Sequence, residues 1–220
     1  MRRGTAARWA IAGAGIATAA WWWSDSAPYP YTQRGILDLP GPFLTHRRLD
    51  ALLDARPGQR VLEIGPGTGL QALHVAGQLG ETGRLDIVDI QQPMLDHVMR
   101  RAAAGTRAGA SSRAAASRPA GAGRISTIVP TLADATKLPF PDGSFDAAYL
   151  VTVLGEIPDP AAAISELARV LRVGGRLVVG ECFDPHFVPF VTLLRYANAA
   201  GLTLGARLGP APVYLAQFRR

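Results

Sequence analysis

The stretch "VLEIGPGTGL", from Val61 to Leu70, joins an apolar strand to three glycines at alternate positions. Gly65, Gly67 and Gly69 have no Cβ atom, so the chain there can take positive φ angles and let a ligand approach the main chain. The helix that follows offers unpaired N–H groups and a positive dipole end, which suit a carboxylate or a phosphate. A tight turn without a ligand is the alternative, and the surrounding pattern decides between the two.

Strands and helices alternate from Gln59 onward, which predicts a parallel sheet covered on both faces. The connector "GPAP" between the last two strands is too short for a crossover, so we expect those strands to pair antiparallel. The helix after Asp159 should have this residue as its N-cap and should end at Gly174. The expected strands are "RVLEIG", "RLDIVDI", "RISTIVPTLAD", "SFDAAYLVTVL", "RLVVGEC", "LTLGARL" and "VYLAQFR".

Residues 29–58 read as a proline-rich connector and one helix that precede the sheet. Pro42 suits a first helical position, and Pro57-Gly58 should end the helix. Leu49, Leu52 and Leu53 would give it one apolar face. We expect these residues to cap the domain that spans residues 59–220.

The net charge of +6 comes from one segment. Its six arginines have no acidic neighbour, and without them 17 basic residues balance 17 acidic ones. Composition rich in Ala, Gly, Ser and Arg predicts a flexible surface insertion over residues 102–123, and a contact with anionic lipid or RNA is the alternative. The arginines are Arg100, Arg101, Arg107, Arg113, Arg118 and Arg124.

The amino end, residues 1–28, has an arginine-rich start, an apolar run and the cluster Trp21–Trp23. A signal peptide, a membrane-spanning anchor, a helix lying at the membrane surface and a helix packed on the domain all fit this pattern. The apolar run is shorter than the ~20 residues that a spanning helix needs. We favour peripheral attachment to the inner face of the membrane and a cytoplasmic domain. The single cysteine, Cys182, fits a reducing compartment and suggests a small core residue.

Acidic side chains stand at successive strand ends around the glycine turn. Glu63 lies two residues ahead of the turn, Asp89 ends the second strand and Asp134 ends the third. A carboxylate placed like Asp89 can accept from both hydroxyls of a ribose. A dinucleotide fingerprint would need glycine at position 70, where the chain has Leu70. The pattern therefore favours a mononucleoside-like ligand.

Together these motifs resemble those of the class I S-adenosylmethionine-dependent methyltransferases. The similar stretches are "VLEIGPGTG", "VDI", "DATKLPFPDGSFDAAYLVTVLGEIPDP" and "ELARVLRVGGRLVVGE". They are most similar to the branch that contains the quinone-biosynthesis C-methyltransferases, although "LGEIPD" replaces a frequent leucine-histidine pair. The resemblance implies an α/β, Rossmann-like, doubly wound sheet of seven strands with the last strand antiparallel.

The resemblance also implies S-adenosyl-L-methionine as the cofactor and assigns its contacts. Asp89 would hold the ribose, Met94 would flank the adenine and Asp134 would meet its amino group. The contacts around the methionine part and the remaining cofactor contacts would be Glu63, Gly65, Gly67, Gly69, Ala135 and Val151.

The methyl group of a sulfonium is already activated, so its transfer is an in-line displacement, and a base is needed only for an acidic nucleophile. Glu156 is the first candidate for that base, followed by His186 and Tyr31. The four histidines show no metal-ligand spacing, and we expect no metal. A small or lipid-like substrate fits best. Nucleic acid is disfavoured because "VTVLGE" lacks the Asn/Asp-Pro-Pro-aromatic turn of base methyltransferases. An RNA methyltransferase that uses the arginine-rich insertion and a non-catalytic cofactor-binding protein are the alternatives.

Overall fold

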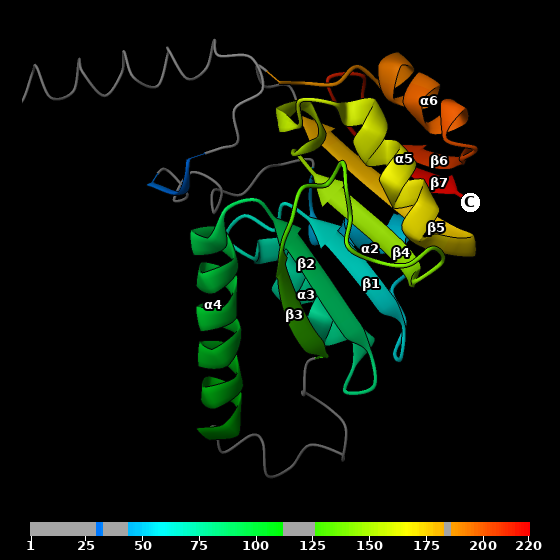
Figure 1. Cartoon of the computed structure of the whole chain (residues 1–220). Helices are drawn as coiled ribbons and strands as arrows, with labels where there is room; N and C mark the ends of the chain where they lie inside the picture. The colour runs from blue at the N-terminus through cyan, green and yellow to red at the C-terminus, as the bar shows by residue number, and fades with distance from the viewer. Residues whose placement is uncertain (1–29, 33–43, 112–125, 183–185) are drawn as a thin grey trace, which may run out of the picture.

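The computed structural model describes residues 30–32, 44–111, 126–182 and 186–220. Within them, seven strands form one sheet in the order β3-β2-β1-β4-β5-β7-β6 (Figure 1). Strands β3, β2, β1, β4 and β5 are parallel, and β7 runs antiparallel to both β5 and β6. The doubly wound sheet with an antiparallel last strand is therefore confirmed. The strands are β1 (Arg60–Ile64), β2 (Arg84–Asp89), β3 (Thr127–Leu132), β4 (Phe145–Val151), β5 (Leu171–Cys182), β6 (Thr203–Leu208) and β7 (Val213–Arg219).

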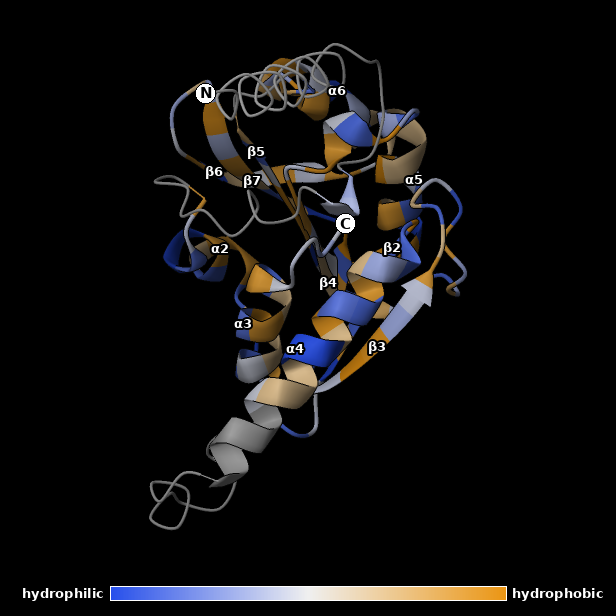
Figure 2. Cartoon of the chain, turned by 90° about the vertical axis from the view of Figure 1, so that its left-hand side faces the viewer, coloured by the Kyte–Doolittle hydropathy of each residue, from blue (hydrophilic) through white to orange (hydrophobic). Residues whose placement is uncertain are grey.

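Helices cover both faces of the sheet, and each face has its own core. Neighbouring residues of a strand point to opposite faces, so Val61 joins the core under α2, α3 and α4 while Leu62 joins the core under α5 and α6. Figure 2 views the sheet along its edge and shows α2 and α3 on one side and α5 on the other. The helices are α2 (His46–Leu53), α3 (Leu70–Leu79), α4 (Gln92–Ser111), α5 (Pro160–Val170) and α6 (Phe190–Ala199).

The capping helix α2 buries the expected leucines but is shorter than expected. Thr45 is extended, with φ −85° and ψ 151°, so the helix begins at His46 and not at Pro42, which lies outside the described residues. At the other end Asp54 is left-handed, with φ 46°, and stops the helix before Pro57. Both ends therefore correct the predicted bounds.

Helix α5 begins as predicted and ends earlier. The Asp159 carboxylate accepts a hydrogen bond from the Ala162 N–H at 2.9 Å, which confirms the N-cap. The helix ends at Val170 because Leu171 already pairs with Phe145 of β4. Gly174, with φ 78°, therefore lies within β5 and does not stop the helix.

Helix α4 continues to Ser111, so the predicted flexible insertion begins too early. Ala102 is only 8% exposed and lies in the same buried cluster as Val98 and Ile128. Alanine has the highest helix propensity, so an alanine-rich composition also suits a continued helix. Residues 112–125 lie outside the described residues.

The predicted apolar segment, residues 1–28, also lies outside the described residues. In the part of the chain that the structure describes, no helix is both long and apolar enough to cross a membrane.

Candidate cofactor and acceptor site

A cavity of about 430 Å³ lies at the carboxyl ends of β1, β2, β4 and β5. Ligands of open α/β sheets bind at this edge, where the strand-to-helix turns meet. Leu44, just before α2, adds to the wall from the capping segment. Leu44 is the one described residue of the predicted cap that lines the cavity, because α2 itself packs its leucines on the face of the sheet.

The three glycines of the turn are needed for different reasons. Gly65 and Gly67 have φ angles of 63° and 53° and line the cavity. A Cβ atom on Gly65 would lie 2.5 Å from Val153 Cγ2, so this glycine also makes room for the segment after β4. Gly69 does not line the cavity; its φ is 83°, and a Cβ there would lie 3.0 Å from Val98 Cγ1 of α4. The structure thus places Gly69 in helix packing and not in the expected ligand contact.

Glu63 is a buried acid with an unused oxygen. Its side chain lines the cavity, the residue is 3% exposed, and its Oε2 has no hydrogen-bond partner among the described residues. Burial raises the pKa of this carboxyl to about 8, and the negative charge of Asp89 adds to the rise. The neighbouring Tyr149 hydroxyl acts in the opposite direction and lowers this pKa. A cationic or hydrogen-donating ligand would satisfy the free oxygen and favour the charged form.

Asp89 and Asp134 both line the cavity but have different surroundings. Burial raises the pKa of Asp89 to about 6, although hydrogen bonds from the N–H groups of Gln91 and Ile90 lower it. Asp89 Oδ1 accepts from the Gln91 N–H at 2.8 Å. Asp134 is exposed, and its Oδ1 accepts from both the N–H and the hydroxyl of Thr136, each at 2.8 Å. One Asp134 oxygen is therefore already occupied in a local turn.

The other predicted cofactor residues also line the cavity: Met94, Ala135 and Val151. Sequence reasoning missed Ile90 and Gln71, which line the part of the cavity near the predicted cofactor residues. Ile90 follows Asp89 and leaves 55% of its surface exposed. Gln71, in the first turn of α3, has a buried Oε1 without a partner among the described residues. The signal for Ile90 was its position directly after the strand-end acid.

The three candidate bases differ in whether they line the cavity. Glu156 lines the cavity, in the short helix η3 (Leu154–Glu156) that follows β4. His186 is outside the lining, and its backbone packs against Gly155, where a Cβ would lie 1.6 Å from the His186 carbonyl oxygen.

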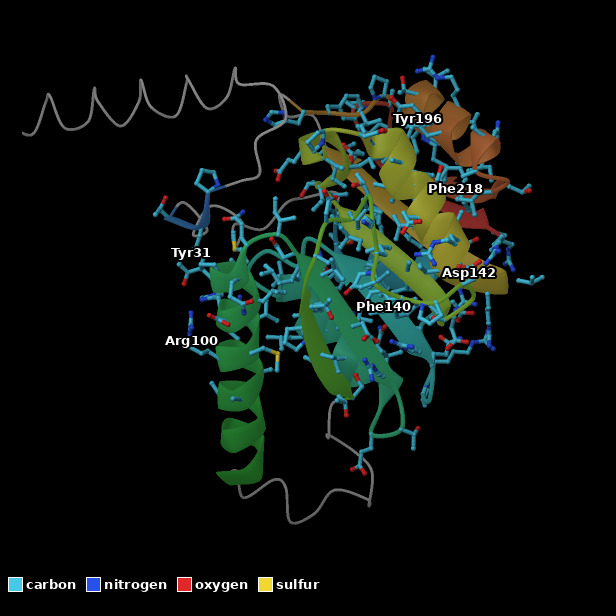
Figure 3. All side chains as sticks on the ribbon, in the orientation of Figure 1. Tyr31, Arg100, Phe140, Asp142, Tyr196 and Phe218 are labelled. Carbon is cyan, nitrogen blue, oxygen red and sulfur yellow. The ribbon has the colours of Figure 1, made fainter. Side chains whose placement is uncertain are left out.

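Tyr31 also lies away from the cavity lining, beside α4 (Figure 3). Its hydroxyl accepts from Arg100 Nη2 at 3.3 Å, and its ring meets His97 edge to face. Only Glu156 of the three candidates therefore faces the cavity.

The prediction that Cys182 is a small core residue is wrong. It is partly exposed and lines the cavity at the end of β5, so it is not a core residue. In the described residues, no group of three metal-ligating side chains gathers.

The comparisons with known proteins agree with this geometry. The demethylmenaquinone methyltransferase of Beutenbergia cavernae is 36% identical over 155 residues, which cover 70% of this chain and 53% of that protein. The UbiE ubiquinone/menaquinone biosynthesis C-methyltransferase of Vibrio vulnificus is 33% identical over 135 residues, with 61% and 45% covered. The chain spans about half the length of these two relatives.

A solved structure and a family model complete the comparison. The S-adenosylmethionine-dependent methyltransferase of Aquifex aeolicus has the same fold, with a TM-score of 0.66, 16% identity and coverage of 87% of this chain and 98% of that one. The family model described as a methyltransferase domain matches residues 62–179, which is more than half of the chain. The chain therefore belongs to the methyltransferase domain family.

Proposed function

We propose that this protein is an S-adenosylmethionine-dependent methyltransferase that acts on a small, lipophilic acceptor. The observation that carries the proposal is the Glu63 carboxyl, buried beside the glycine turn with one oxygen that no described residue bonds. An isolated buried carboxylate is costly, so such a group implies a partner that arrives with the ligand. The ammonium group of a methionine moiety is a partner of this kind.

The residues of the cavity fit the rest of the cofactor. Asp89 would accept from the ribose hydroxyls, and the exposed Ile90 and the buried Met94 would flank the adenine. Asp134 would meet the adenine amino group with the oxygen that Thr136 does not use. Gln71 would add a polar contact at the methionine end. When bound, the cofactor supplies an already activated methyl group.

The rest of the cavity lining would hold the methyl acceptor; its residues are Leu44, Thr152, Val153, Glu156, Ile157, Pro158 and Cys182. This part of the lining is mostly apolar and includes one carboxylate, that of Glu156. Apolar walls exclude water and orient a lipophilic molecule, and orientation supplies most of the acceleration in a displacement. Glu156 would take the proton of an acceptor that loses one, and would only orient an acceptor that loses none.

Two measurements test this function. Isothermal titration should show binding of S-adenosylmethionine and of its demethylated product, S-adenosylhomocysteine, and much weaker binding of NADH. Incubation with methyl-labelled cofactor and a cell lipid extract should then yield a labelled lipophilic product by mass spectrometry. Tight NADH binding would contradict the cofactor assignment. Binding without any labelled product would favour a non-catalytic cofactor-binding protein.

We also propose a cytoplasmic location with peripheral membrane contact through residues 1–28, which would bring a lipophilic acceptor near the cavity. The support is the tryptophan-rich apolar run of the sequence. Deleting Met1–Trp23 should move the protein from the membrane pellet to the supernatant while cofactor binding persists. Activity that requires RNA and falls steeply with salt would instead favour the RNA methyltransferase alternative.

A further inference from the structure

Thr152, the first residue after β4, has an unusual backbone conformation. Its φ is 56°, in the left-handed region, which costs a β-branched residue about 1–2 kcal/mol. In the described residues, Asp54 is the one other non-glycine residue with positive φ, and there it ends a helix. Strain of this kind persists only where the surroundings fix it, and it gathers at functional sites.

Contacts on both sides fix the backbone of Thr152. Its N–H donates to the Gly180 carbonyl of β5 at 2.7 Å. The next residue, Val153, fills the space over Gly65, and Gly155 packs against the His186 carbonyl. The chain therefore needs a left-handed residue at this point. Glycine or asparagine would adopt that conformation with less strain, so the threonine side chain calls for a separate reason.

The Thr152 hydroxyl has a defined hydrogen-bonding role. Its oxygen donates its one hydrogen to the Val151 carbonyl at 2.7 Å. While this hydrogen bond is kept, the hydroxyl offers a ligand only the lone pairs of Oγ1, which accept. Thr152 lines the cavity, in the segment after β4 that also contributes Val153 and Glu156. A strained threonine thus adds a neutral acceptor to a wall that is otherwise mostly apolar.

We propose that Thr152 determines specificity by selecting methyl acceptors that carry a hydrogen-bond donor, a hydroxyl or an N–H, on an apolar frame. The inference rests on the proposed function, because it assigns this wall to the methyl acceptor. A lipophilic molecule without a donor would leave the lone pairs of Oγ1 without a hydrogen bond on binding. A net hydrogen bond of this kind corresponds to about fivefold in affinity.

The single cysteine of the chain makes a direct test feasible, because Cys182 lines the same cavity. The protein saturated with S-adenosylhomocysteine is treated with the thiol reagent 5,5′-dithiobis(2-nitrobenzoic acid), and protection of Cys182 measures occupancy. The probes are 4-heptylphenol and 4-heptylanisole, which share the apolar frame and differ in the hydroxyl donor. Wild type should be protected by the phenol at about one-fifth of the anisole concentration or less.

Variants separate the hydroxyl from the strain. Thr152→Val is nearly isosteric and equally β-branched but lacks the hydroxyl, so it should lower the preference for the phenol over the anisole about fivefold. Thr152→Ser keeps a hydroxyl and should show the wild-type preference. If Thr152→Val does not fold, Thr152→Gly removes the hydroxyl without strain and should give the same loss. Thr127→Val, at an exposed position at the start of β3, makes the same chemical change at the other end of the strand from the cavity and should behave as wild type.

Three results would overturn the proposal. The phenol preference could survive in Thr152→Val and in Thr152→Gly, or neither probe could protect Cys182 although S-adenosylhomocysteine binds. Thr152→Val could also weaken S-adenosylhomocysteine binding more than about tenfold, which would place Thr152 in the cofactor half. Failure of wild type to bind S-adenosylhomocysteine at all would instead count against the proposed function.

Discussion

The two halves of the cavity are built in different ways. The half that we propose for the cofactor comes largely from short stretches at the ends of β1 and β2, so residues close in sequence form most of its wall. The half that we propose for the acceptor joins residues far apart in sequence: Leu44, Thr152, Val153, Glu156, Ile157, Pro158 and Cys182. The first half is therefore set by local strand-to-helix geometry, whereas the second depends on tertiary packing. The contact between Gly65 and Val153 is where the two halves meet.

The largest effect should come from filling that contact. Gly65→Ala puts a side chain on a residue with φ 63° and a Cβ atom 2.5 Å from Val153 Cγ2. Conformational strain and overpacking together should lower the free energy of unfolding by about 2–4 kcal/mol, measured by urea denaturation. The displaced turn should also weaken S-adenosylhomocysteine binding.

Gly77→Ala is the matched control for this change. Gly77 lies inside α3, and a Cβ there meets nothing within 4 Å. This variant should be more stable than wild type by about 0.5–1 kcal/mol, because alanine favours the helix. If Gly65→Ala were as stable as wild type, the two halves would not be locked together at this point.

A smaller effect confined to the cofactor half is expected from Asp89→Ala. Loss of a carboxylate that accepts from ribose hydroxyls should weaken S-adenosylmethionine binding on the order of ten- to a hundredfold by isothermal titration. Asp96→Ala, on the exposed surface of α4, is the control and should bind as wild type does. Equal affinity of Asp89→Ala and wild type would show that this acid does not touch the cofactor.

The unliganded cofactor half should also be sensitive to pH. Burial raises the pKa of Glu63 to about 8, so the folded protein keeps a proton that the unfolded chain releases near pH 4.5. The stabilisation of the folded state by protonated Glu63 is complete below about pH 4.5 and is lost as pH rises from about 4.5 to about 8.

Glu63→Gln should therefore remove the pH dependence that this carboxyl causes. At pH 8 the variant should be more stable than wild type by about 1–2 kcal/mol, while at pH 4.5 the difference should shrink. Denaturant titrations at both pH values measure this, and the same variant should bind S-adenosylmethionine more weakly. A constant difference at both pH values would argue against a buried, protonated Glu63.

The smallest effect should come from a region outside both halves. Replacing residues 112–123 with a short Gly/Ser linker should leave the melting temperature nearly unchanged, because loop length alters closure entropy only slowly. Helix α4 up to Ser111 is kept, since Ala102 is buried. A marked fall in melting temperature would mean that this segment packs on the domain.

The contrast between the halves also explains what could be predicted from sequence. Glu63 and Asp89 follow from strand periodicity, because the end of a parallel strand fixes which edge of the sheet an acid reaches. The role of Gly69 did not follow, because the side chain that fills its space, Val98, belongs to another helix.

Predictions for the acceptor half were weaker for the same physical reason. The "VTVL" pattern continues the strand and gives no sign that Thr152 turns left-handed, since Gly180 and Gly65 impose that conformation from elsewhere. Tyr31 was expected in the cap over the site, but its ring contacts His97 of α4 and its hydroxyl accepts from Arg100 of the same helix. Both sets of contacts join residues distant in sequence, so no local sequence pattern predicts them.

The carbonyl groups that end α2 have a consequence for the order of assembly. The Leu52 carbonyl accepts from the Gln217 side chain, and the carbonyls of Leu53 and Asp54 accept from Arg176. One of these donors belongs to β7, which a ribosome makes more than 150 residues after α2. The C-terminal end of α2 therefore gains its full set of hydrogen bonds to the sheet only after β7 has been synthesised, so we expect this helix to dock late on a nascent chain.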